Sequence, residues 1–158
     1  MEDIRTLDSV DLSSKTLVLR VDFNCPVSNN GNVALLDTRR IDDHVKKTII
    51  PLLKSSRKPR RIVLLAHQGR RDHDDSVSQF ESLEEYKRTP IIEMLSGIDN
   101  LVVGFDGFSV AHRSQPSVVG LASLGPLYAG NVVLEEIGAL SKALVKPVSC
   151  LSRKETAD

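Results

Sequence analysis

Two short polar side chains, Asp22 and Asn24, follow closely on an apolar run at residues 16–19, and Pro26 comes two residues after Asn24. The run is short and apolar and contains Thr and Val, which predicts a buried strand. Because side chains alternate along a strand, Asp22 and Asn24 lie on one face at its carboxyl end. Ligands of open α/β sheets bind at that end. The pair therefore either contacts a ligand or belongs to an ordinary turn, where Asp and Asn beside Pro are common.

Cationic and imidazole side chains occur at the other places where the pattern predicts that a strand ends or a helix begins. Five of them are candidates for binding an anion: Arg40, His67, Arg70, His112 and Arg113. Gly69 lets the chain turn sharply after His67, and Asp106 follows the third predicted strand. Arginine presents a planar, charged fork that matches carboxylate and phosphate, and histidine adds a further donor. Gathered at one sheet edge, these groups would suit an anion; each alone also fits a surface or structural position.

The elements that must position these groups alternate along the chain. Apolar runs predict strands at residues 16–19, 61–66 and 101–103, and the second run is typical of a strand buried on both faces. Helical spacing predicts three helices, marked by Ile41, Val45, Ile49, Leu52 and Leu53, by residues 84–95, and by Val133, Ile137, Leu140 and Leu144. The alternation predicts the α/β class with a parallel sheet, in a Rossmann-like lobe of three layers.

Local signals give expectations for the helix ends and the loops. Asp37 or Thr38 caps the start of the first helix. Pro51 lies within that helix and should kink it or end it early, and Pro90 should do the same in the second. Polar stretches predict loops at residues 54–59, 71–78 and 105–117, and the tail at 148–158 carries no pattern.

Composition limits the classes of function. The 158 residues fit one domain, and 21 Lys and Arg balance 21 Asp and Glu, so no basic excess points to nucleic acid. No apolar run approaches a membrane span, and the first residues contain no signal core. Cys25 and Cys150 lack metal-type spacing, which predicts free thiols in a reducing cytoplasm. The mixed-charge stretch 71–75 matches no calcium loop, so we expect no metal site, and no glycine-rich nucleotide motif is present.

Several segments together resemble the phosphoglycerate kinase family, specifically its archaeal type. Residues 19–27 are similar to the family's first-strand motif, and residues 37–41 followed by Thr48 and Ile49 resemble its first helix entry. Residues 63–70 resemble the second-strand motif, and residues 111–117 resemble a later substrate loop. Further matches lead towards the hinge, at residues 128–130, 135–137 and 140–144. Four motifs in the right order, between residues 6 and 147, make this resemblance specific.

The resemblance implies a two-lobed glycolytic enzyme that transfers a phosphoryl group between 1,3-bisphosphoglycerate and ADP, or 3-phosphoglycerate and ATP. Its N-terminal lobe, residues 1–147 here, binds 3-phosphoglycerate through a basic patch, and its C-terminal lobe binds magnesium-ATP or ADP. Carried over by motif, Asp22 and Asn24 contact the glycerate end of the substrate, and Arg40 stabilises charge on the transferring phosphoryl group. The patch is completed by His67, Arg70, His112 and Arg113. The choice of Arg40 over Arg39 rests on the Arg-Ile pair and the following His44, and either assignment stays open.

The chain also departs from the family. An Asn-Arg-Phe-type strand has no counterpart, which suggests an internal deletion near residues 103–106, and no nucleotide lobe follows Lys146 and Pro147. A sheet that loses an interior strand must re-pair its neighbours or expose an edge. We therefore expect a monomeric, cytoplasmic lobe that keeps the 3-phosphoglycerate-binding half and is inactive alone. The alternatives are a non-catalytic phosphate-binding or anion-binding module, a decayed remnant, and half of a split enzyme whose partner is a separate nucleotide lobe.

Overall fold

The computed structural model describes residues 4–28, 34–68 and 82–145, and it confirms the predicted α/β class. Four parallel strands form one sheet in the order β4–β1–β5–β6. Their bounds are β1 Thr16–Arg20, β4 Arg61–Leu65, β5 Leu101–Phe105 and β6 Leu127–Ala129. A separate antiparallel pair joins β2 Val27–Ser28 to β3 Ala34–Leu35. Neither this pair nor β6 was predicted, since two or three residues give too short a pattern to recognise.

Strand β1 is the centre of the molecule, and all five of its residues are buried. Its side chains alternate between the two faces, so Leu17 and Leu19 join one apolar cluster while Val18 joins the other. Thr16 lies opposite Arg61 of β4 and Leu101 of β5, which fixes the register on both sides. The predicted strand at 16–19 is therefore confirmed and extends by one residue, to Arg20.

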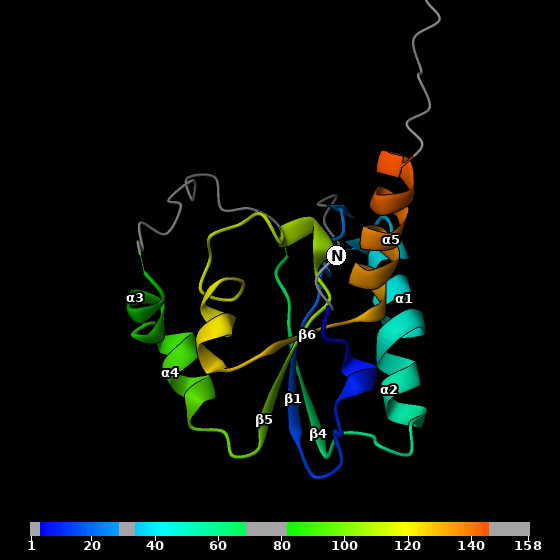
Figure 1. Ribbon diagram of the computed structural model, residues 1–158. Helices are drawn as coiled ribbons and strands as arrows, with labels where there is room; N and C mark the ends of the chain where they lie inside the picture. Colours follow the sequence, from blue (N-terminus) through cyan, green and yellow to red (C-terminus); the bar gives the residue numbers. More distant parts are fainter. Residues whose placement is uncertain (1–3, 29–33, 69–81, 146–158) are drawn as a thin grey trace, which may run out of the picture.

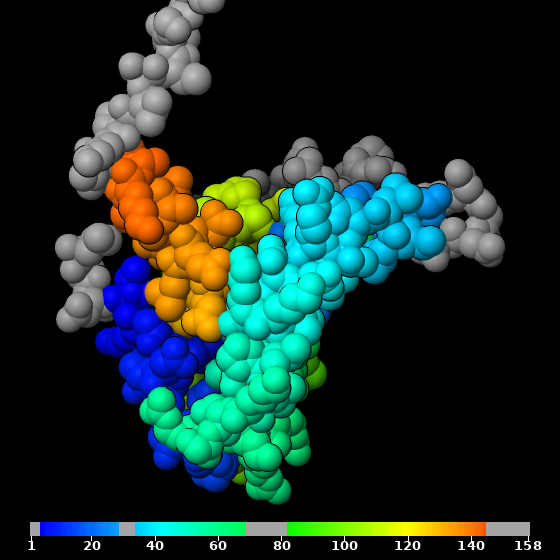
Figure 2. Space-filling model, turned by 90° about the vertical axis from the view of Figure 1, so that its right-hand side faces the viewer, coloured from blue at the N-terminus to red at the C-terminus, as the bar shows by residue number. Residues whose placement is uncertain are grey.

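Helices cover both faces of the sheet, as a lobe of three layers requires (Figure 1). The bounds are α1 Arg39–His44, η2 Val45–Ile49, α2 Ile50–Lys54, α3 Leu83–Lys87, α4 Pro90–Ser96 and α5 Asn131–Val145. One face carries α1, η2, α2 and α5, and the other carries α3 and α4. Figure 2 shows the first of these layers, in which α5 lies beside the α1–η2–α2 helix. Short 3-10 turns complete the elements: η1 Leu7–Ser9, η3 Phe108–Val110 and η4 Gly120–Leu124.

Pro51 does not end the first helix early, so that part of the prediction was wrong. The helix runs from Arg39 to Lys54 because its middle part, η2, adopts the wider π-helical turn. In an α-helix the proline ring would collide with the carbonyl of Lys47, four residues earlier, and leave it without a donor. The wider turn relieves this crowding. The side-chain amide of Asn131 supplies the donor, at 2.6 Å from the Lys47 carbonyl oxygen.

Pro90 separates two short helices, as predicted for residues 84–95. It occupies the first turn of α4, where its missing N–H has no partner to lose.

The structure also shows which of the two predicted residues caps the first helix. The Asp37 carboxylate accepts the backbone N–H of Arg39 at 2.9 Å, while the Thr38 side chain makes no capping bond. Asp37 is therefore the cap.

None of the residues of β4 is buried, so the prediction that this strand is buried on both faces was wrong. Strand β4 also lies at the edge of the sheet. It pairs only with β1, and within the described residues no strand covers its other side. Arg61 is exposed, and Leu64 is 41% exposed. An unbroken apolar run reports packing against the helical layers and carries no information about the neighbour in the plane of the sheet.

The strand order changes direction at β1, which determines where a ligand is expected. From β1 the chain crosses to β4 on one side, and it then returns to β5 on the other side. Ligands of open α/β sheets bind at such a point, outside the carboxyl ends of the strands. The segments that follow β1 and β5 carry Asp22 and Asp106, and both side chains are buried.

Two further observations concern the part of the chain that the structure describes. No helix there has both the length and the apolar character needed to cross a lipid bilayer. No group of three or more His, Cys, Asp or Glu side chains there converges on a position suited to a metal ion. Cys25 is buried and free, whereas Cys150, the stretch 71–75 and the tail at 148–158 lie outside the described residues.

Candidate anion-binding site

Asp22 connects three segments at the carboxyl end of β1. Its side chain is only 5% exposed, and one oxygen, Oδ2, accepts a hydrogen bond from the Arg40 guanidinium at 2.6 Å. The Ser109 hydroxyl donates to the same oxygen. The other oxygen, Oδ1, accepts the backbone N–H of Asn24 at 3.0 Å. One carboxylate thus joins the loop after β1 to the start of α1 and to η3.

The surroundings of Asp22 keep it ionised. Burial by itself raises the pKa of Asp22, but the hydrogen bonds from Ser109 and Asn24 and the charge of Arg40 outweigh it, so the pKa lies below the ordinary aspartate value. Because the pKa in the folded state is depressed, Asp22 contributes stability above the pKa of the unfolded carboxyl group. That contribution is lost as the pH falls through the folded value.

Arg20, the last residue of β1, is buried and only 1% exposed. Its Nη1 donates to the carbonyl oxygens of Val21 and Leu65, at 2.5 and 3.2 Å, and its Nη2 lies 3.2 Å from Nδ1 of His67. Its Nε has no hydrogen-bond partner within the described residues. No carboxylate there forms an ion pair with it, so a buried positive charge stands beside the site without full compensation. Burial lowers the pKa of Arg20, and nearby Asp22 opposes that effect.

His67 is oriented by Arg20. A guanidinium can only donate, so Nδ1 of His67 accepts and the ring proton lies on Nε2. Burial lowers the pKa of His67, and the charges of Arg20, Arg113 and Arg40 lower it further, against the opposing effect of Asp22. The ring is therefore neutral at pH 7, and its Nε2–H is a donor.

We expect a proton NMR titration of His67 to give a pKa below its ordinary value of 6.5, and to give a higher pKa when 3-phosphoglycerate is added. An anion beside the ring stabilises the protonated form, whereas the arginines oppose it in the free protein. Because the folded pKa is depressed, His67 stabilises the fold above pH 6.5, and this contribution is lost as the pH falls through the folded value. The variant His67→Gln identifies the resonance, and a pKa of 6.5 or above without ligand would contradict the geometry.

Arg113 supplies a second cation that has no carboxylate partner among the described residues. It follows η3, its backbone N–H is bonded to the Val110 carbonyl oxygen at 3.0 Å, and its Nε is buried without a partner within the described residues. Its charge lowers the pKa of both Arg20 and His67, which places it within electrostatic range of the two. The three arginines of the cluster outnumber its one carboxylate, Asp22, so the cluster suits an anion. Hereafter "the arginine cluster" means Arg20, Arg40, Arg113, His67 and Asp22.

The structure brings together four of the predicted site residues, Asp22, Arg40, His67 and Arg113, and Asn24 joins them through its backbone. His112 is exposed, and no hydrogen bond or ion pair within the described residues links it to the cluster. Arg70 lies outside the described residues. Arg39 is paired with Asp37 at 2.6 Å and its side chain is 89% exposed, so Arg40 is the arginine that reaches Asp22.

A buried series of hydrogen bonds, which the sequence analysis did not identify, connects the cluster to the start of α5. The backbone N–H of Asp22 donates to Nε2 of His44 at 3.2 Å, and Nδ1 of His44 lies 2.9 Å from Oδ2 of Asp106. Oδ1 of Asp106 accepts the backbone N–H groups of Val132 and Val133, at 3.0 and 3.2 Å. The sequence pattern placed Asp106 at a strand end but could not pair it with His44, because the two are 62 positions apart. Arg20 carries a weak signal, as a charged residue that closes an otherwise apolar run.

A polar pocket lies at the other end of the sheet from the arginine cluster. It has a volume of about 410 Å³ and is lined by Ser14, Thr16, Arg60, Arg61, Gly97, Ile98, Asp99 and Asn100. These residues precede or begin β1, β4 and β5, so the pocket lies at the amino ends of the strands. It provides an internal comparison for the arginine cluster.

Comparison with known proteins identifies relatives with a similar sequence and solved structures with the same fold. The family model described as phosphoglycerate kinase matches residues 7–97 and 78–152. Phosphoglycerate kinase of Sulfolobus acidocaldarius is 33% identical over 190 residues, covering 88% of this chain and 45% of the relative. Phosphoglycerate kinase 1 of Methanosarcina acetivorans is 31% identical over 195 residues, covering 90% and 45%.

Solved structures agree at the level of the fold. Phosphoglycerate kinase from Pyrococcus horikoshii OT3 superimposes with a TM-score of 0.75 at 23% identity, over 92% of this chain and 47% of that one. The enzyme from Coxiella burnetii gives a TM-score of 0.65 at 21% identity, over 93% and 46%. The chain thus spans somewhat less than half the length of the relatives that it matches. On the extent of the family-model match, this chain belongs to the phosphoglycerate kinase family.

Proposed function

We propose that this chain is the 3-phosphoglycerate-binding half of a phosphoglycerate kinase and that the arginine cluster holds that substrate or a similar small phosphorylated acid. The observation that carries the proposal is that two of the three arginines in the cluster have no carboxylate partner among the described residues. Arg40 is paired with Asp22, whereas Arg20 and Arg113 each have a buried Nε without a partner in the described residues and no carboxylate counterion there. Buried cations without counterions are costly, so an anionic ligand would stabilise them.

The roles proposed for single residues follow their places in the cluster. The Arg40 side chain is half exposed, so it could contact a phosphoryl group in transfer, and it is our candidate catalytic residue. Asp22 and Asn24 would contact the glycerate end, and the Nε2–H of His67 would donate to the anion. Contributions from Arg70 and His112 stay predictions from the family resemblance.

Calorimetric titration with 3-phosphoglycerate tests this function, with glycerate as the matched control that lacks the phosphate. We expect the phosphorylated acid to bind more tightly by about tenfold or more, because each charge-assisted bond to phosphate contributes roughly 1.5–3 kcal/mol. Equal affinity for the two acids would show that the cations do not recognise phosphate. The absence of heat with either acid would refute the proposed site.

Catalysis would need a partner for this half. Phosphoryl transfer depends on positioning and on positive charge around both ends of the transferring group. In the family, magnesium-ATP or ADP supplies the second end from the other lobe, and relatives are more than twice as long as the part matched here. We therefore place this chain as one lobe of a cytoplasmic glycolytic transferase, with a nucleotide lobe as its partner.

We predict that the purified chain gives no turnover in a coupled assay with 3-phosphoglycerate, ATP and magnesium. Full-length phosphoglycerate kinase run beside it is the positive control, and preparations of Arg40→Ala measure the contaminating background. Turnover above that background would show that a complete nucleotide site lies within the 158 residues. A non-catalytic anion-binding module is the second candidate function, favoured by the excess of arginines over carboxylates in the arginine cluster, and it would show 3-phosphoglycerate binding with no gain on adding a nucleotide lobe.

The position of the missing internal segment is also a proposal. The relatives match over 190 residues or more, which exceeds the 158 residues of this chain, so they contain residues that it lacks. The sequence suggests a gap near 103–106. The two family-model matches instead overlap at 78–97, where α3 and α4 meet. We favour that second location, because β5 pairs in unbroken register with its neighbours through Val103 and Phe105.

A further inference from the structure

His44 is buried between two hydrogen-bond partners that fix its protonation. A backbone N–H can only donate, so Nε2 of His44 must accept from Asp22, and the ring proton must lie on Nδ1, facing Asp106. Both oxygens of Asp106 accept hydrogen bonds, as an ionised carboxylate does. His44 is therefore held as the neutral Nδ1–H tautomer and uses both of its nitrogens. The Phe23 ring packs edge-on against it, with centroids 5.9 Å apart.

Asp106 extends this connection to the start of α5. It accepts two backbone N–H groups of the first turn, where a negative charge also suits the helix dipole. Gly130 precedes that turn, and a Cβ there would collide with the Asp106 carboxylate, so the close approach requires glycine. The predicted final helix therefore has its amino end bound to the segment that follows β5.

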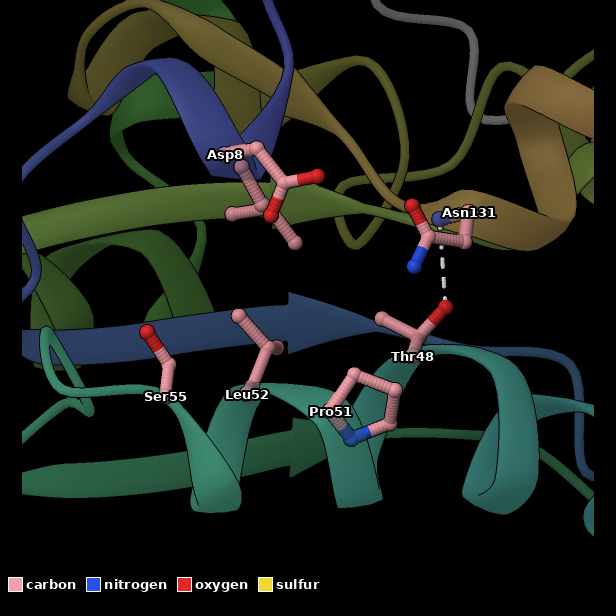
Figure 3. A pocket seen from close by; sticks show the side chains of 7 residues that line it. Asp8, Thr48, Pro51, Leu52, Ser55 and Asn131 are labelled. Atoms are coloured by element: carbon pink, nitrogen blue, oxygen red, sulfur yellow. Dashed lines mark hydrogen bonds between the residues drawn. The ribbon is translucent and has the colours of Figure 1, made fainter.

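Asn131 fastens the same helix end to the first helix. Its backbone N–H donates to the Thr48 hydroxyl at 3.1 Å, and its side chain donates to the Lys47 carbonyl oxygen. Figure 3 shows Asn131 beside Thr48 and Pro51 at one wall of a small pocket of about 50 Å³. The start of α5 is thus bound both to η2 and, through Asp106 and His44, to the backbone of Asp22.

We propose that His44 is a positioning residue for anion binding. By accepting the Asp22 N–H it fixes the backbone at the point from which the Asp22 carboxylate holds Arg40 and Ser109. This inference rests on the proposed function, since it assigns His44 a role in the same site. The charged groups around this unit are Asp106, from the segment after β5, and, on the far side of the Asp22 peptide, the Asp22 carboxylate with Arg40.

Two matched variants separate the two hydrogen bonds of His44. In His44→Asn the shorter amide can replace the Nδ1–H donor to Asp106, and the acceptor for Asp22 is lost. In His44→Gln the longer side chain can place an oxygen near the former Nε2, and the bond to Asp106 is lost. If His44 positions Asp22, His44→Asn weakens 3-phosphoglycerate binding by about tenfold, whereas His44→Gln binds within about threefold of the unchanged protein and mainly loses thermal stability.

A ligand-independent readout accompanies the titrations. Amide hydrogen exchange at Asp22 should speed up by about tenfold in His44→Asn and stay near the original rate in His44→Gln. Nitrogen NMR of the unchanged protein should show the Nδ1–H tautomer. If 3-phosphoglycerate does not bind the unchanged protein, the proposed function fails, and the exchange rates and tautomer still decide whether His44 holds Asp22. An Nε2–H tautomer, or equal affinities and exchange rates in the two variants, would overturn the inference.

Discussion

Replacing Arg40 by alanine will weaken 3-phosphoglycerate binding by about a hundredfold or more, because two losses add. The variant removes a guanidinium from the mouth of the site, and it also removes the ion pair, at 2.6 Å, that neutralises Asp22. The remaining carboxylate then faces an anionic ligand directly and repels it. Isothermal titration calorimetry of the folded variant measures the change, with circular dichroism as the check on folding.

The neighbouring arginine provides the matched control. Arg39 has the same side chain and the adjacent position, but it is paired with Asp37 and is 89% exposed. An exposed pair of this kind contributes roughly 0–1 kcal/mol, so Arg39→Ala should leave the affinity within about threefold. Equal losses in the two variants, or a larger loss at Arg39, would show that Arg40 is not the ligand-facing arginine and would reverse the assignment made from the geometry.

Asp106→Ala will destabilise the lobe by roughly 3 kcal/mol or more, since each buried donor left without an acceptor costs about 1–3 kcal/mol, and this is a large part of the roughly 5–15 kcal/mol expected for a domain of this kind. The Asp106 side chain is fully buried and accepts three hydrogen bonds, from His44, Val132 and Val133. Without it, three donors lose their acceptor in the protein interior, and the start of α5 loses a favourable negative charge. Urea unfolding followed by circular dichroism gives the change in the free energy of unfolding.

Asp42→Ala is the control for this stability experiment. Asp42 forms an exposed pair with Lys46, one turn further along the helix, at 3.3 Å. Such pairs contribute about 0.3–0.5 kcal/mol, so the midpoint of unfolding should barely move. If Asp106→Ala proves no more destabilising than Asp42→Ala, the buried chain from Asp22 to α5 does not support the fold as described.

The sequence predicted those features that depend on local pattern. Apolar runs located β1, β4 and β5, and helical spacing located the helices. Positions after a strand selected Asp22, His67 and Arg113, and the start of a helix selected Arg40. The order of the motifs then indicated the phosphoglycerate kinase family, which the comparisons confirm. These successes share one cause, since parallel strands bring their carboxyl ends to one edge and so gather distant residues without further information.

The features that were missed depend on contacts between distant segments. Pro51 was expected to disturb its helix, but the donor that satisfies the Lys47 carbonyl comes from Asn131, 84 positions away. The edge position of β4 depends on which strands are present elsewhere, so an apolar run cannot reveal it. His44 and Arg20 gain their roles from partners in distant segments that follow the strands, and neither residue type nor spacing singles them out beforehand.

Mapping 3-phosphoglycerate on the protein by amide chemical-shift changes tests the central claim most directly. The claim predicts that shifts saturate together at Asp22, Arg40, His67 and Arg113, around the carboxyl ends of β1 and β4 and the segment after η3. The polar pocket at the amino ends of the strands, lined among others by Arg60 and Arg61, should stay unchanged. Saturable shifts gathered at that opposite pocket, with none at the arginine cluster, would contradict the account.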